Sequence, residues 1–465
     1  MSKKKNLEDL LQTAGSPVKM LRNSQTGPNV YPGVPPEFTN WRDEQAAWQK
    51  TCVLFNQSYH MADLAVEGPD ALRLLSHLGV NTFANFTVDK AKQFVPCSYD
   101  GHVIGDVILF YLAEKKFNLV GRIPVLNWIR FHAETGGYDV GVALDERSAA
   151  RPDPFNRKSY RFQIQGPNAM RVIEKVTGKK PPDLKFFNMC GMNIAGKQVR
   201  ALRHGMAGQP GFELFGPSAE GETVREALVT GGEEFGLRQV GGRAYSSNTL
   251  ESGWIPSPLP AIYSGAKMKA YREWLTVDSY EARASIGGSF NSPNIEDYYF
   301  TPWDLGYGPF VKFDHDFIGR EALEQMAKQP PRRKVTLALD SADVTRTISS
   351  QLDQGDRAKF IEFPSAVYSM HPYDKVTVQG QTVGISTWIG YSSNERRMLT
   401  LAILENEYTV PGAEVILVWG EENGGTRKPT VEAHVQTEIR ATVSPVPYSE
   451  VARKVYAEGW RTGKF

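Results

Sequence analysis

The order of apolar and polar positions in the first half of the chain predicts the same small unit twice. Residues 65–71 read Ala-Val-Glu-Gly-Pro-Asp-Ala and lead into an apolar helical pattern over residues 72–75. Roughly one hundred residues later, residues 163–169 read Gln-Ile-Gln-Gly-Pro-Asn-Ala and lead into a similar pattern over residues 170–173. Each reads as a strand, a Gly-Pro turn and an amphipathic helix. We interpret the pair as two related α+β units, against the alternative that Gly-Pro-x-Ala is simply a common helix entry.

Shorter patterns surround these two units. Alternating apolar positions predict strands at residues 93–98, 103–112, 198–204 and 212–215. Helical spacing predicts helices at residues 7–11, 127–132 and 220–229. Ser218 is the candidate N-cap of the last of these helices, and Gly231-Gly232 its end. Residues 254–310 have weak periodicity and many Pro, Gly, Ser, Tyr and Trp residues, and a long irregular segment of this kind is often functional.

The last third of the chain has a different pattern. Short strands separated by turn residues are predicted at residues 335–339, 375–378, 384–389, 399–404, 414–419 and 439–443. This pattern is typical of a β-sandwich or β-barrel. We therefore predict an α+β protein with a boundary near residue 330, in which residues 1–330 hold the two α+β units and residues 331–465 form a β-rich domain.

Composition narrows the function classes. The chain has 465 residues, 41% hydrophobic, with 53 basic and 52 acidic residues and a formal charge of +1, so neither nucleic acid nor an anionic membrane is the expected partner. The three cysteines (Cys52, Cys97 and Cys190) are far apart and the eight histidines show no ligand spacing, so no metal site is predicted. A reducing, cytoplasmic location is expected, because no apolar leader follows the lysine-rich start and no apolar run could span a bilayer.

Several motifs, weak alone, resemble the glycine-cleavage T-protein (aminomethyltransferase) family when taken in order. They are Phe55-Asn56-Gln57-Ser58, Gly68-Pro69-Asp70-Ala71, Gly101-His102-Val103-Ile104-Gly105-Asp106, Gln165-Gly166-Pro167, Gly211-Phe212-Glu213-Leu214, Gly242-Arg243-Ala244, Leu250-Glu251-Ser252-Gly253, Gly308-Pro309-Phe310-Val311-Lys312 and Phe317-Ile318-Gly319-Arg320-Glu321-Ala322-Leu323. The resemblance implies a three-domain fold around a central folate channel, with the two α+β domains interleaved.

The chain departs from ordinary T-proteins in two places. Where they carry paired aspartates it has Gly105-Asp106, and Asn56 stands where they usually have aspartate. These losses argue against glycine cleavage. The long stretch over residues 243–260 resembles the family's aryl O-demethylases, which act on lignin-derived vanillate, 3-O-methylgallate and syringate. Three further stretches resemble these enzymes too. The three are residues 20–25, 203–208 and 419–428.

The resemblance implies transfer of a methyl group from an aryl ether to tetrahydrofolate, giving a phenol and 5-methyltetrahydrofolate. A phenolate is a poor leaving group, because a phenol keeps its proton up to a pKa of about 10. A hydrogen-bond donor must therefore act on the ether oxygen as the bond breaks. The resemblance places Tyr245 between folate and substrate, so Tyr245 is the candidate donor, against the alternative of an ordinary core tyrosine. His60 is the second catalytic candidate.

The substrate-binding candidates are Arg122, His60, Gln57 and Tyr31. The Arg122 guanidinium could bind a benzoate carboxylate through two hydrogen bonds, although a surface ion pair is the alternative. His60 and Gln57 could bind the ring hydroxyl beside the methoxy group, and Tyr31 could cover the ring. For each of these three the alternative is an ordinary structural or surface residue.

The folate candidates are Glu213, Trp254, Gln163 and Tyr245. A carboxylate can pair with the amidine-like edge of the pterin through two hydrogen bonds, and the resemblance assigns that position to Glu213. Trp254 resembles the aromatic residue that packs on the cofactor. Gln163 is a polar residue on a strand that otherwise reads apolar, and it is a candidate to reach the folate. The alternative is that Gln163 is a solvent-facing strand residue.

Several readings of the activity stay open at this stage. Syringate is the favoured substrate because residues 56–60 differ from the sequence expected of a vanillate-type enzyme. Vanillate and 3-O-methylgallate are the alternatives. A relative acting on an amine and a folate-binding protein without catalysis are two further hypotheses. The loss of a carboxylate at Gly105 and the presence of Arg122 disfavour a cationic substrate.

Overall fold

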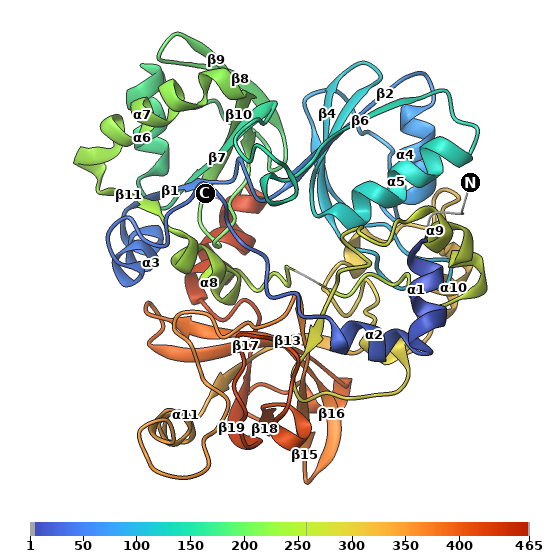
Figure 1. The fold of residues 1–465 in the computed structure, drawn as a ribbon. Helices are drawn as coiled ribbons and strands as arrows, with labels where there is room; N and C mark the ends of the chain where they lie inside the picture. Colours follow the sequence, from blue (N-terminus) through green and yellow to red (C-terminus); the bar gives the residue numbers. More distant parts are fainter. Residues whose placement is uncertain (1–4, 257, 464–465) are drawn as a thin grey trace.

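A computed structural model describes residues 5–256 and 258–463; residues 1–4, Ser257 and residues 464–465 lie outside the described part. The polar start of the chain and the stretch over residues 243–260 are thus described only in part, because they include residues 1–4 and Ser257. Figure 1 shows two units of sheet and helices above a C-terminal β-domain.

The first unit is built on a five-stranded antiparallel sheet in the order β3-β4-β5-β2-β6. Its strands are β2 (Ala62–Glu67), β3 (Ala91–Phe94), β4 (Val107–Ala113), β5 (Lys116–Gly121) and β6 (Gly141–Asp145). The helices α4 (Ala71–Leu78) and α5 (Ile123–Thr135) contact each other, and α5 also contacts β2, β5 and β6. Apolar residues of both helices, such as Leu75 and Ile129, share one buried core with Leu64 and Val66 of β2. Burial of these side chains is the main force that holds the helices on the sheet.

The second unit is built on a six-stranded sheet in the order β11-β1-β7-β10-β9-β8. Its strands are β1 (Cys52–Asn56), β7 (Ser159–Gln165), β8 (Met189–Ile194), β9 (Lys197–Arg203), β10 (Gly211–Pro217) and β11 (Leu237–Val240). Only β1 and β11 pair in parallel. The helices α6 (Ala169–Thr177) and α7 (Gly221–Gly232) share a core with Leu54, Phe162 and Ile164. Because side chains alternate along a strand, the residues of β1 and β7 that come between these core residues point to the opposite face of the sheet.

The predicted repeat is confirmed, since β2 and α4 in one unit match β7 and α6 in the other. The turns between strand and helix contain Gly68 and Gly166, with φ angles of 139° and 122°. A Cβ atom at Gly68 would lie 2.5 Å from the Asp139 carbonyl oxygen, and one at Gly166 would lie 2.7 Å from that of Thr51. Each Gly-Pro turn therefore needs glycine for its backbone angle and because a neighbouring backbone passes close by.

The chain passes from one unit to the other and back. Strand β1 lies in the six-stranded sheet, β2 to β6 form the five-stranded sheet, and β7 returns to a place beside β1. The segment before β1 includes α1 (Leu7–Ala14), α2 (Pro17–Asn23) and α3 (Trp41–Lys50). The division of the chain into domains at residue 330 stays a prediction.

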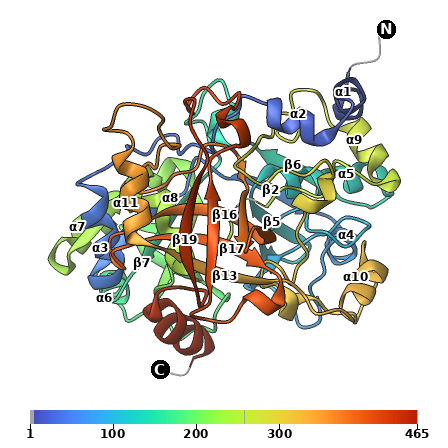
Figure 2. The ribbon, with the colours of Figure 1, turned by 90° about the horizontal axis from the view of Figure 1, so that it is seen from below.

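The C-terminal part is a closed barrel in the order β13-β17-β16-β15-β18-β19. Its strands are β13 (Arg333–Leu339), β15 (Asp374–Val378), β16 (Gln381–Ser392), β17 (Arg397–Leu404), β18 (Glu414–Trp419) and β19 (Thr437–Ser444). All six predicted strands are present, and Figure 2 shows them from below, with α11 (Ser341–Ser349) beside them. The sequence left open whether this domain is a β-sandwich or a β-barrel, and the structure shows a barrel. The α+β fold class is confirmed.

Four local predictions need correction. Ser218 is not the N-cap of α7, because it begins a 3-10 turn (Ser218–Glu220) and Glu220, which precedes the helix, makes no side-chain cap. Residues 95–98 and 103–106 are not strand, and Gly105 has a φ of 157° that interrupts the run before β4. Helix α5 is longer than predicted, because Pro124 lies in its first turn, where the missing N–H is not needed.

Residues 254–310 are largely irregular, as predicted, with short elements between the loops. These are α9 (Lys269–Trp274), β12 (Ile286–Gly287), which pairs with β14 (His371–Pro372), and several 3-10 turns. Helix α8 (Gly242–Ser252) precedes this stretch, and α10 (Arg320–Met326) follows it.

Candidate active site

Four of the predicted residues gather around the first turn of α8. Tyr245 Oη lies 3.1 Å from His60 Nε2, and Gln57 Nε2 donates to the same oxygen at 3.2 Å. The Tyr31 ring lies over Tyr245 at a centroid distance of 4.5 Å and against His60 at 5.1 Å. Gln57 and His60 follow β1, and Tyr31 comes from the irregular N-terminal segment. Residues from three separate parts of the chain thus meet at one phenolic hydroxyl.

Burial fixes the protonation states of this cluster. It raises the pKa of Tyr245 well above its ordinary value and that of Tyr31 to about 12. Burial, together with the charges of Arg122 and Arg157, lowers the pKa of His60 to about 3. At neutral pH the two tyrosines are therefore phenols and His60 is an uncharged imidazole. The Tyr245 hydroxyl keeps a proton that it can donate.

Arg122 is the cation whose charge acts on three members of this cluster. It lies at the end of β5, just before α5, and its charge acts on the pKa values of Tyr31, His60 and Tyr245. Its Nη1 donates to Tyr280 Oη at 3.4 Å. Within residues 5–256 and 258–463 the guanidinium forms no salt bridge, so the surface ion pair considered from the sequence is absent there. A guanidinium that has no ion-pair partner and whose charge reaches a buried cluster is suited to binding an anionic substrate group.

Strand β7 presents a polar face on the side opposite its core. Arg161, Gln163 and Gln165 alternate with apolar residues, yet Gln163 and Gln165 are fully buried. Gln163 is therefore not a solvent-facing strand residue. In the sheet it lies opposite Phe55 on one side and Glu213 on the other. This face of the six-stranded sheet lies against the Tyr245 cluster and carries two of the predicted folate residues, Gln163 and Glu213.

The carboxylate of Glu213 is already engaged. It forms a buried ion pair with Arg161, and His204 Nδ1 lies 3.7 Å from its other oxygen. Burial acts to raise the pKa of Glu213, but the charges of Arg161 and His204 outweigh it and the pKa is lowered, so the group is ionised. A carboxylate has about four acceptor positions, so this pairing leaves room for further donors.

Three amide atoms on the same face have no partner among the described residues. They are Gln57 Oε1, Gln163 Oε1 and Gln165 Nε2. Gln163 Nε2, by contrast, donates to the His204 carbonyl at 2.8 Å. Buried polar atoms without partners are costly, which points to a ligand that supplies hydrogen-bond donors to the two oxygens.

Trp254 belongs to a second cluster, around Asp106. Its Nε1 donates to Asp106 Oδ2 at 3.2 Å and to Tyr307 Oη at 2.9 Å, and Gln93 also donates to Asp106. Burial raises the pKa of Asp106 to about 6 even though these hydrogen bonds and the charge of Arg122 act to lower it. The Arg122 charge thus reaches both clusters.

Sequence reasoning did not assign Asp106 or Met206. Asp106 was noted only as the carboxylate left at the Gly105-Asp106 position, although a lone aspartate inside an apolar run was a usable signal. Met206 Sδ lies 3.1 Å from Gln57 Nε2 and 3.6 Å from Tyr245 Oη. No feature of the sequence distinguished Met206 from an ordinary packing methionine.

Comparison with known proteins decides the family. The sequence model of the GCVT N-terminal domain matches residues 15–257. The chain belongs to the GCVT aminomethyltransferase family. Within it, the chain is 62% identical over 460 residues to a syringate O-demethylase of Sphingobium sp. (strain SYK-6), covering 99% of each protein. It is 28% identical over 402 residues to a sesamin methylene transferase of Sinomonas sp. (strain No.22), covering 83% of this chain and 84% of that protein.

The GCVT fold is also found by structural comparison. The aminomethyltransferase T of the glycine cleavage system from Bartonella henselae matches with a TM-score of 0.60 at 20% identity, covering 97% of this chain and 99% of that one. The family prediction from the ordered motifs is thereby confirmed. Among the described residues, no group of three or more His, Cys, Asp or Glu side chains is placed to hold a metal, and no helix is long and apolar enough to cross a bilayer.

Proposed function

We propose that this protein is a tetrahydrofolate-dependent O-demethylase that takes a methyl group from syringate and releases 3-O-methylgallate. The observation that carries the proposal is the protonated Tyr245 hydroxyl, held by Gln57 and His60 and under the influence of the Arg122 charge. The 62% identity to a syringate O-demethylase supports the same assignment.

In this proposal each residue of the Tyr245 cluster has a distinct task. Arg122 binds the carboxylate of the benzoate, and Tyr31 packs on its ring. Neutral His60 and Gln57 bind the ring hydroxyl and orient Tyr245. As the bond between methyl carbon and ether oxygen breaks, the Tyr245 O–H donates to that oxygen, where negative charge develops. A donor that is already oriented in a buried site stabilises this charge without rearranging.

Tetrahydrofolate supplies a secondary amine nitrogen that accepts the methyl group. The residues present fit its pterin, because the ionised Glu213 and the free oxygen of Gln163 are acceptors for the N–H groups of such a ring. Trp254 would pack on the cofactor, with its indole orientation set by Asp106 and Tyr307. Asp106, with a pKa of about 6, is suited to take up the proton that the amine loses.

Syringate is preferred to vanillate or 3-O-methylgallate on the strength of the same relative. Turnover of the three acids under identical conditions tests this preference. The highest kcat/KM is expected with syringate, and equal values for all three would remove the preference while leaving the demethylase proposal intact.

The decisive experiment is anaerobic incubation of the purified protein with syringate, with and without tetrahydrofolate, followed by mass spectrometry. We expect 3-O-methylgallate and 5-methyltetrahydrofolate to appear together, and only when folate is present. No product from any methoxybenzoate, with folate still bound, would favour a folate-binding protein without catalysis. A cytoplasmic location stays part of the proposal. An amine substrate is disfavoured by the unpaired Arg122, which would repel a cation.

A further inference from the structure

The C-terminal helical segment η9 (Val451–Gly459) is fastened to the loop over residues 203–208 through one hydroxyl group. Tyr456 is buried, and its Oη donates to the Gly205 carbonyl at 2.6 Å. The same Oη accepts from the Gly205 N–H at 3.1 Å. One side chain therefore satisfies both backbone groups of Gly205.

The contact between segment and loop is close at several points. Arg203 donates to the carbonyl of Trp460, the residue that follows the segment, at 2.7 Å, and its guanidinium lies 4.3 Å from the centroid of the Trp460 ring. A Cβ atom at Gly208 would lie 2.5 Å from the Ala452 Cβ, and one at Gly205 would lie 2.9 Å from the Tyr456 ring. Gly208 is therefore required for the fit between loop and segment, whereas Gly205 is required first by the Gln209 carbonyl, which would lie 1.8 Å from its Cβ atom, and then by the Tyr456 ring.

The same loop contacts the polar face of the six-stranded sheet. The His204 carbonyl accepts from Gln163 Nε2 at 2.8 Å. The N–H groups of Met206 and Ala207 donate to Gln165 Oε1 at 2.6 and 3.2 Å. Met206 Sδ then lies beside Gln57 and the Tyr245 hydroxyl. The loop therefore holds Gln163 and Gln165 by direct hydrogen bonds, and it touches the Tyr245 cluster through the Met206 sulfur.

We propose that Tyr456 is a positioning residue, and that the C-terminal segment holds the 203–208 loop in the conformation that the folate site requires. This inference rests on the proposed function for its link to folate and methyl transfer. The Tyr456 hydroxyl bonds the Gly205 backbone, so Tyr456 would act on the folate site through Gly205.

The test compares Tyr456→Phe with Tyr448→Phe in the full chain. The first substitution removes only the oxygen that holds Gly205. Tyr448 lies eight positions earlier, and its hydroxyl makes no hydrogen bond within the described part of the chain, so it is the matched control. Three quantities are measured: hydrogen exchange of the amides of residues 204–207, tetrahydrofolate affinity by calorimetry, and the KM values for folate and syringate.

We expect Tyr456→Phe to speed exchange at Gly205 and to weaken tetrahydrofolate binding by about tenfold, because two buried backbone groups lose their partner. The KM for folate should rise in proportion while the KM for syringate changes little. Tyr448→Phe should match the unchanged protein. Faster exchange with unchanged folate affinity would overturn the positioning role, as would unchanged exchange. Exchange and calorimetry need no turnover, so a failure of the demethylase proposal would be seen separately.

Discussion

At the scale of single residues, the chemistry depends on charge states that burial sets. Tyr245 and Tyr31 stay protonated, His60 stays neutral and Asp106 becomes a weaker acid, each mainly because its charged form is poorly solvated. Arg122 remains as the charge that acts on all four. A neutral donor, a weak base and one cation are what an anionic methoxybenzoate and a developing phenolate need.

Tyr245→Phe removes the proposed donor and leaves the ring. We expect turnover of syringate to fall by about a hundredfold or more, as for the loss of one donor to a developing oxyanion, while tetrahydrofolate affinity is largely kept. Single-turnover kinetics and calorimetry measure the two effects. Tyr391→Phe is the control, since Tyr391 packs in the same region and its hydroxyl has no partner among the described residues. Unchanged turnover in Tyr245→Phe would remove the donor role.

Arg122→Ala should raise the KM for syringate, because the carboxylate loses its cation, with little effect on folate affinity. Arg122→Lys keeps the charge but not the paired hydrogen bonds, so an intermediate KM is expected. The comparison substrate is 2,6-dimethoxyphenol, which lacks the carboxylate. An equal loss of kcat/KM with this phenol would show that Arg122 acts on the fold instead.

Asp106 should control the acid side of the pH profile. If the Asp106 carboxylate takes up a proton during the reaction, turnover falls as the pH drops below about 6, because the carboxylate is then already protonated. Asp106→Asn should be slow at every pH and should not show this fall. The pKa in the folded state is raised, so the native state binds more protons between about pH 4 and 6, and stability falls as pH rises through that window. Asp106→Asn should therefore raise the thermal midpoint more at pH 8 than at pH 4. The reverse order would contradict the assignment.

At the scale of elements, each unit depends on a strand, a Gly-Pro turn and a helix that fit closely against a neighbour. The turn glycines Gly68 and Gly166 lie where another backbone passes, whereas Gly178, at the end of α6, has nothing within 4 Å of its Cβ position. Glycines with positive φ therefore differ in how much a side chain at their position would destabilise the fold.

This contrast gives a matched pair of substitutions. Gly178→Ala should cost about 1 kcal/mol, from its φ of 67° alone. Gly166→Ala adds a clash with the Thr51 backbone and should cost several times more, on the order of 3 kcal/mol. Thermal unfolding measures both, and equal shifts in the midpoint would show that the Thr51 backbone moves aside easily.

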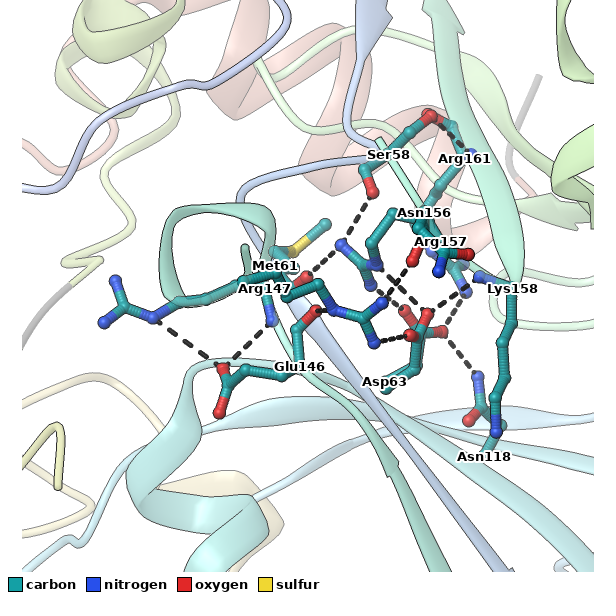
Figure 3. A network of polar contacts seen from close by, with 12 residues as sticks. Ser58, Met61, Asp63, Asn118, Glu146, Arg147, Asn156, Arg157, Lys158 and Arg161 are labelled. Atoms are coloured by element: carbon teal, nitrogen blue, oxygen red, sulfur yellow. Dashed lines mark hydrogen bonds and ion pairs between the residues drawn. The ribbon is translucent and has the colours of Figure 1, made fainter. Parts of the chain in front are cut away.

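At the scale of the molecule, a buried network of charges joins the two sheets (Figure 3). Asp63 of β2 accepts from Arg157 at 3.1 Å and from Arg161 of β7 at 3.2 Å. Arg157 also pairs with Asp145 of β6, and Arg161 continues to Glu213. The predicted folate carboxylate is thus tied to the contact between the two units.

Asp63→Asn leaves two buried guanidinium groups with too little negative charge. We expect a loss of stability of about 3 kcal/mol and weaker tetrahydrofolate binding, because Arg161 then holds Glu213 differently. Glu450→Gln is the control, since its pair with Lys454 is exposed and screened by solvent, so its loss should change stability little. Thermal unfolding and calorimetry measure the effects, and equal shifts for the two variants would contradict this role.

The sequence by itself determined the elements whose signal is local. The six barrel strands, the paired strand-turn-helix units and the ordered family motifs could be read directly, because alternation and turn residues act over a few positions. The tertiary structure decided everything that depends on distant neighbours. The sequence shows that β7 has a polar face, but only packing buries Gln163 instead of exposing it. Only the fold brings Asp106 to Trp254, Met206 to Tyr245 and Tyr456 to Gly205, because those pairs are far apart along the chain and their contacts come from how the sheets, the barrel and the C-terminal segment pack.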